Sequence, residues 1–151
     1  MGTIQDKSEP DLPPHLRGRA GGEGRVGLHQ ALKANPRIEL GRAGEKAAAD
    51  LLRRRGYEVV GSGFRARRGE LDLICRRGRD LVVVEVKTRT DDSFGTPAEA
   101  VGSRKCRALM AAAAEYRALA EWRGAIRYAV VGLTVNEEGR FEAELIEDAF
   151  T

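Results

Sequence analysis

The sequence predicts a single α/β domain built on a mixed sheet, and three observations support this fold class. Apolar residues recur at helical spacing in the segment before Gly56, and a strongly β-branched run occupies residues 81–87. An alanine-rich segment at 109–119 then separates this run from two later strand-like stretches. The resulting order of helix, three strands, helix and two strands fits one domain with a mixed sheet.

Residues 1–36 differ from the rest of the chain, and we interpret them as a flexible tail. They hold four of the five prolines and several glycines, and their apolar residues show no period. His15 and His29 fall in this segment, where surface histidines are a better interpretation than metal ligands. The folded domain is therefore expected at residues 37–151.

The composition limits the classes of function. The net charge of +3 is compatible with a nucleic-acid partner without requiring one. The frequent arginines suit phosphate contacts, whereas an aromatic content of 5% argues against a base-stacking platform. Two cysteines, Cys75 and Cys106, and the lack of an apolar leader or long apolar run predict a cytoplasmic protein without a membrane partner.

The elements follow in order from local signals. The first helix is led in by residues 38–45 and ends at Gly56 after a basic last turn. A short strand at 57–60 precedes a turn-like stretch, in which Arg65, Arg67 and Arg68 form a basic loop able to follow a nucleic-acid backbone. The remaining expected elements are a hairpin of strands 70–75 and 81–87, a surface loop at 91–102, a helix from Ser103, and strands at 126–135 and 141–146.

Charged residues interrupt the predicted hairpin, and its register decides where they lie. If the hairpin turns on residues 78–79, Asp72 lies opposite Glu85 and Glu70 lies opposite Lys87. All four side chains then share one face of the sheet. A three-residue loop would break this arrangement, because a slip of one residue reverses the face.

Such a cluster suits a divalent metal ion. Two facing carboxylates repel each other by roughly 3–4 kcal/mol at an effective dielectric constant near 20. A divalent cation removes this repulsion, and Mg²⁺ typically takes one or two carboxylates while keeping water and phosphate ligands. A neighbouring lysine can stabilise developing negative charge, so the set suits phosphodiester hydrolysis. The alternative is a solvated sheet face on which Glu70 and Lys87 form an ordinary surface ion pair.

Several strings resemble the YraN-like family of small bacterial proteins. They are Gly69-Glu70-Leu71-Asp72-Leu73-Ile74, Val83-Val84-Glu85-Val86-Lys87-Thr88-Arg89, Gly41-x-x-Gly44-Glu45, and Phe94-Gly95-x-Pro97-x-Glu99-Ala100-Val101 with Lys105. The resemblance runs from Leu40 towards the C-terminus. One departure lies in a late strand, where the family commonly carries Arg-Phe-Asp and this chain has Arg127-Tyr128-Ala129.

That family is similar to the PD-(D/E)xK nuclease superfamily, most closely to archaeal Holliday-junction resolvases. The resemblance implies a restriction-endonuclease-like αβββαβ core and a Mg²⁺ or Mn²⁺ cofactor. It implies that Asp72 and Glu85 bind the metal with the Val86 backbone carbonyl, that Lys87 is the catalytic lysine, and that Glu45 is the first-helix glutamate.

The supporting residues leave alternatives open. Glu45 borders the apolar stripe of its helix and could face the sheet, although a first-turn glutamate is also favoured by the helix dipole. Glu70 is either an additional acid of the metal site or only the partner of Lys87. Arg89 and Lys105 are candidates for phosphate contacts, and each could instead be a plain surface cation.

The sequence thus indicates a metal-dependent endonuclease acting on DNA, with branched or structured DNA as a candidate substrate. The alternative is a non-catalytic module that keeps the nuclease fold and binds nucleic acid or a protein. A homodimer is left open.

Overall fold

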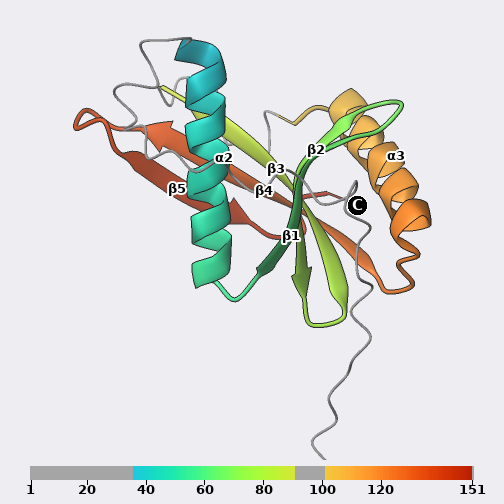
Figure 1. The fold of residues 1–151 in the computed structure, drawn as a ribbon. Helices are drawn as coiled ribbons and strands as arrows, with labels where there is room; N and C mark the ends of the chain where they lie inside the picture. Colours follow the sequence, from blue (N-terminus) through green and yellow to red (C-terminus); the bar gives the residue numbers. More distant parts are fainter. Residues whose placement is uncertain (1–35, 91–100, 151) are drawn as a thin grey trace, which may run out of the picture.

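The computed structural model of the chain describes residues 36–90 and 101–150 (Figure 1). Apart from Pro36, the predicted tail lies outside these residues, as does most of the loop expected at 91–102. The elements are α2 (Pro36–Arg54), β1 (Glu58–Arg65), β2 (Glu70–Arg77), β3 (Asp80–Arg89), α3 (Ser103–Ala120), β4 (Ile126–Val135) and β5 (Phe141–Ile146). This order confirms the predicted α/β fold class.

The strands form one mixed sheet in the order β1-β2-β3-β4-β5. Only the β3–β4 pair is parallel, and the other three pairs are antiparallel. A parallel pair needs a long crossover connection, and α3 belongs to the segment that supplies it. The αβββαβ order followed by β5 agrees with the predicted core.

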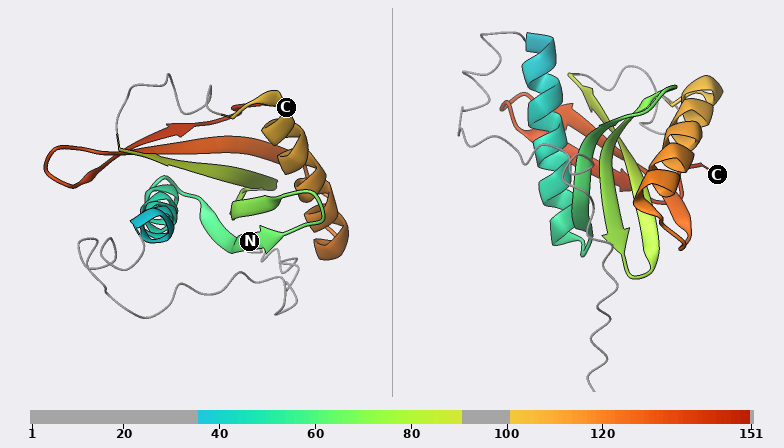
Figure 2. Two further views of the ribbon diagram at one scale, coloured as in Figure 1. Left: turned by 90° about the horizontal axis from the view of Figure 1, so that it is seen from above. Right: turned by 45° about the vertical axis from the view of Figure 1, so that its right-hand side comes forward.

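The two helices cover opposite faces of the sheet (Figure 2). Side chains alternate along β3, so Val84 packs with Leu52 of α2, whereas Val83 packs with Tyr116 of α3. Cys75 is buried in the α2-side core, and both cysteines are free thiols. None of the helices in residues 36–90 and 101–150 has the length and apolar character needed to cross a bilayer.

Helix α2 begins earlier than its apolar period suggested, and it contains two glycines. Gly44 lies so close to β3 that a Cβ atom there would collide with Thr88 Oγ1, and it would lie 3.3 Å from Leu133 Cδ1. Glycine therefore permits a close approach between α2 and the sheet. This contact determines the position of the neighbouring Glu45 relative to β3.

Strand β1 extends well beyond the predicted residues 57–60. Its register against β2 shifts between Val59 and Gly61, and Gly63 adopts a positive φ of 62°. This irregularity lets a glycine-containing segment continue as a strand. Arg65 is consequently the last residue of β1, paired with Glu70, rather than part of the basic loop as predicted.

Candidate active site

The β2–β3 hairpin has the predicted register. Arg77 pairs with Asp80, and Leu73 pairs with Val84, so the turn consists of residues 78–79. Gly78 adopts the positive φ of 61° that such a tight turn requires. Beyond the Leu73–Val84 pair, towards the open end of the hairpin, the next residues are Asp72 on β2 and Glu85 on β3.

Strand β2 bends at Asp72. Leu73 packs in the α2-side core, whereas Leu71 packs in the α3-side core, although two residues apart in a regular strand share a face. The Val86 backbone N–H donates a hydrogen bond of 2.9 Å to Asp72 Oδ2. Asp72 therefore spans the place where β2 leaves β3, with its carboxylate held against the backbone of β3.

Glu85 is the buried charged residue of the site. Its side chain is only 4% exposed, and Oε1 lies 3.5 Å from Lys105 Nζ and 3.9 Å from Lys87 Nζ. Oε2 is buried and has no hydrogen-bond partner among the described residues. Burial and then the Asp72 carboxylate raise the pKa of Glu85, whereas Lys105 and Lys87 lower it.

Glu45 extends the acidic cluster from α2. Burial is the main cause that raises its pKa to about 7, and the carboxylates of Asp72 and Glu70 raise it further, against a lowering by Arg42. A carboxylate senses other carboxylates this strongly only when they are near. Glu45 therefore lies near Asp72 and Glu70, the two acids of β2.

The cluster fits a hard divalent cation with an incomplete protein cage. Within residues 36–90 and 101–150, no three acidic, histidine or cysteine side chains converge closely enough to hold a metal ion on their own. Mg²⁺ does not need such a cage, because it commonly uses one or two carboxylates and completes its shell with water and phosphate. The buried, unpartnered Oε2 of Glu85 is the atom that favours a cation here.

Two predicted contacts differ in the structure. The β2–β3 pairing ends at Leu73, so neither the Asp72–Glu85 pair nor the Glu70–Lys87 pair of the predicted hairpin forms. Glu70 pairs instead with Arg65 of β1. Because β2 bends away, Lys87 instead forms its ion pair with Glu85 on its own strand. Glu70 contributes to the site through its charge beside Glu45.

Lys105 lies in the acidic cluster, a contact that the sequence analysis did not anticipate. The sequence makes Lys105 a candidate for phosphate contact or a plain surface cation, whereas its Nζ contacts Glu85. The available signal was helical spacing, since Lys105 precedes the buried residues Leu109 and Ala112 by four and seven positions. Arg89 ends β3 and is half-buried, paired with Thr134 of β4.

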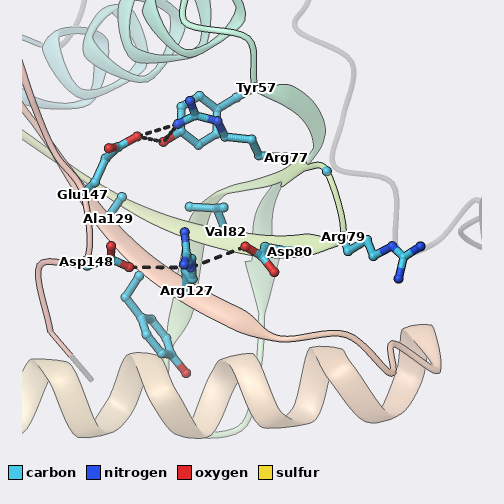
Figure 3. Close-up of a pocket in the computed structure, with 11 residues that line it drawn as sticks. Tyr57, Arg77, Arg79, Asp80, Val82, Arg127, Ala129, Glu147 and Asp148 are labelled. Carbon is cyan, nitrogen blue, oxygen red and sulfur yellow. Dashed lines mark hydrogen bonds and ion pairs between the residues drawn. The ribbon is translucent and has the colours of Figure 1, made fainter.

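A pocket of about 380 Å³ lies at the turn end of the β2–β3 hairpin, away from the acidic cluster (Figure 3). Five of its six charged side chains are paired with one another: Arg77 bonds Tyr57 and Glu147, and Arg127 lies between Asp80 and Asp148. We therefore place the candidate site at the cluster and not in this pocket.

Ala129, at the position where the resemblance noted in the sequence leads to an expected aspartate, lines that pocket and belongs to the α2-side core. It pairs with Val84 across β3–β4, so its side chain points to the face opposite Lys105 and the Glu85 carboxylate. The missing acid would therefore not complete the charge cluster around Glu85.

Comparison with known proteins gives a consistent family. Residues 44–141 match the sequence model described as uncharacterised protein family UPF0102. A UPF0102 protein of Symbiobacterium thermophilum is 43% identical over 112 residues, which cover 74% of this chain and 95% of that protein. Relatives from Syntrophomonas wolfei and Anaeromyxobacter dehalogenans are 42% and 41% identical, covering 74% and 81% of this chain and 97% and 84% of their own lengths. The matched residues include every acid and lysine of the candidate site: Glu45, Glu70, Asp72, Glu85, Lys87 and Lys105.

Proposed function

Because this chain belongs to the uncharacterised protein family UPF0102, the YraN-like family, we propose its function from its own site: a metal-dependent endonuclease that hydrolyses DNA phosphodiester bonds. The proposal includes membership of the PD-(D/E)xK nuclease superfamily. The observation that carries it is the position of the Asp72 carboxylate, which accepts a hydrogen bond from the Val86 N–H directly after the buried Glu85. The Lys87 ammonium lies 3.9 Å from Glu85 on the same strand.

Each residue has a chemical part in this reaction. Asp72 and Glu85, with the Val86 carbonyl, would hold Mg²⁺ or Mn²⁺, which when bound supplies positive charge at the phosphate and a more acidic water. Lys87 stabilises the negative charge that develops on the phosphate oxygens as water attacks in line and the 3′ oxygen leaves. Glu45, with its pKa near neutrality, orients the attacking water and can accept its proton.

The test is cleavage of branched and linear DNA by the full chain with Mg²⁺ or Mn²⁺. Asp72→Ala should abolish cutting. Asp72→Asn keeps an acceptor for the Val86 N–H, so it should stay folded yet lose more than the roughly 10–100-fold typical of a group that only supports a metal ligand. Asp50→Asn, an exposed acid of α2 paired with Arg53, is the matched control and should cut normally.

Equal cutting by wild type and Asp72→Asn would refute the proposal. If the chain binds DNA equally well with and without a chelator and cuts with neither metal, the non-catalytic binding module becomes the better assignment.

A further inference from the structure

A set of exposed arginines lies on one side of the acidic cluster. Four exposed arginines lie there, two on the β1–β2 turn and two on the first turns of α3: Arg67, Arg68, Arg104 and Arg107. We call these four residues the α3 strip. None of them takes part in an ion pair among the described residues.

The two halves of the strip form one surface, because the β1–β2 turn packs on α3 (Figure 1). The Phe64 ring contacts the Tyr116 ring edge-on, with centroids 5.2 Å apart. The Arg67 backbone N–H donates a hydrogen bond of 3.0 Å to Glu115 Oε2. Gly69 lies against the helix, where a Cβ atom would be 3.2 Å from the Ala108 carbonyl oxygen. The arginines of the turn are therefore held beside those of α3.

The strip leads directly to the candidate site. Arg104 and Arg107 are one turn apart on α3 and flank Lys105, whose Nζ lies 3.5 Å from Glu85 Oε1. A polyanion lying along the arginines would therefore reach Lys105 and then the carboxylates.

The opposite end of the sheet carries the opposite charge. The β4–β5 hairpin exposes four glutamates, Glu137, Glu138, Glu142 and Glu144. This hairpin projects away from α3 (Figure 1). A polyanion is thus attracted to the α3 side and repelled from the far end, which orients its approach.

We propose that the α3 strip is the surface that grips the DNA backbone and delivers a phosphate to the cluster. The identity of the ligand as DNA rests on the proposed function, whereas the location of the binding surface rests on the four arginines. Contacts of this kind go to phosphates, so they position the substrate without reading its sequence. Each phosphate that is neutralised should contribute about 0.9 to the slope of log binding constant against log salt.

The experiment measures binding of a fluorescein-labelled DNA duplex to the full chain by anisotropy, in EDTA, over a salt series. Arg67→Gln/Arg68→Gln and Arg104→Gln/Arg107→Gln should each weaken binding and reduce the salt slope by about two. Arg54→Gln/Arg55→Gln removes the same charge from exposed positions at the end of α2 and should leave the slope unchanged. Thermal unfolding of each variant checks that it is folded.

A wild-type slope in both strip variants would overturn the inference, as would an equal loss in the α2 control or no duplex binding by wild type. Failure of the endonuclease proposal has a different signature. If duplex binding depends on the α3 strip but DNA is not cut with any metal, the proposed role of the α3 strip is supported and the endonuclease proposal is refuted.

Discussion

Glu85 is held by two lysines on the same oxygen atom, whereas its other oxygen is buried without a donor among the described residues. Both cations must share Glu85 with any metal ion that binds there. Lys105 comes from α3, and its side chain is 45% exposed, so it can leave more easily than Lys87, which is fixed to the same strand as Glu85. We therefore expect Lys105 to balance the charge of Glu85 until a metal ion and a phosphate arrive.

This arrangement predicts that Lys105→Met strengthens Mn²⁺ binding while slowing DNA cleavage. Removing a competing, partly exposed cation should gain about 0.5–1 kcal/mol, or roughly two- to fivefold in affinity measured by calorimetry at pH 8. Lys46→Met, an exposed lysine of α2, is the control for loss of one charge. Unchanged Mn²⁺ affinity in Lys105→Met would mean that Lys105 acts only on the substrate.

At the scale of elements, the distance between α2 and β3 depends on Gly44. A methyl group at this position meets Thr88 Oγ1, whereas a methyl group at Gly41 of the same helix meets nothing within 4 Å. The two glycines therefore provide a matched pair of positions in one helix.

We predict that Gly44→Ala lowers the free energy of unfolding by about 1–3 kcal/mol through overpacking. Gly41→Ala should instead raise it by up to about 1 kcal/mol, because alanine is the better helix former. Urea denaturation measures both, and removal of the obstructing atom by Thr88→Ala should reduce the effect of Gly44→Ala. If Gly44→Ala and Gly41→Ala change the free energy of unfolding with equal sign and size, the close approach of α2 to β3 at Gly44 is contradicted.

The sequence was informative about some of these elements and not others. The hairpin register could be predicted, because a two-residue turn and the alternation along β3 both constrain it. The bend at Asp72 could not, since β2 leaves β3 where the β1–β2 turn packs on α3. The irregularity in β1 lies between Val59 and Gly61 and has no local signal either. The Arg65–Glu70 pair follows from the β1–β2 register.

At the scale of the whole molecule, the acidic cluster couples folding to pH. The pKa of Glu45 rises to about 7, and that of Glu85 is also raised, each mainly by burial, from the ordinary value of 4.5 for a glutamate. A carboxyl whose pKa is raised on folding favours the folded state fully below pH 4.5. That contribution is lost as pH rises towards 7.

We therefore predict that the metal-free protein loses about 1–3 kcal/mol of stability between pH 5 and pH 8 because of these groups. Thermal unfolding in EDTA across this range measures the loss. Glu85→Gln should flatten the profile, whereas Asp50→Asn should reproduce that of wild type. A wild-type pH profile in Glu85→Gln would show that Glu85 is already ionised at little cost.

The fold as a whole could be predicted from the order of its elements and from the family strings, because both depend on local patterns. The meeting of Lys105 with Glu85 depends on long-range packing instead, since α3 must dock before the two residues are neighbours. The register that brings the acids of the hairpin together was therefore predictable from local patterns, whereas the contact of Lys105 with Glu85 was not.

The position of β3 in the middle of the sheet has a consequence for dynamics. Its first half is hydrogen-bonded to β2 on one edge and to β4 on the other. Segments bonded on both edges exchange their amide protons only when the domain opens globally. Glu85 follows directly on such a segment, so local fluctuations should leave its backbone in place until the protein melts.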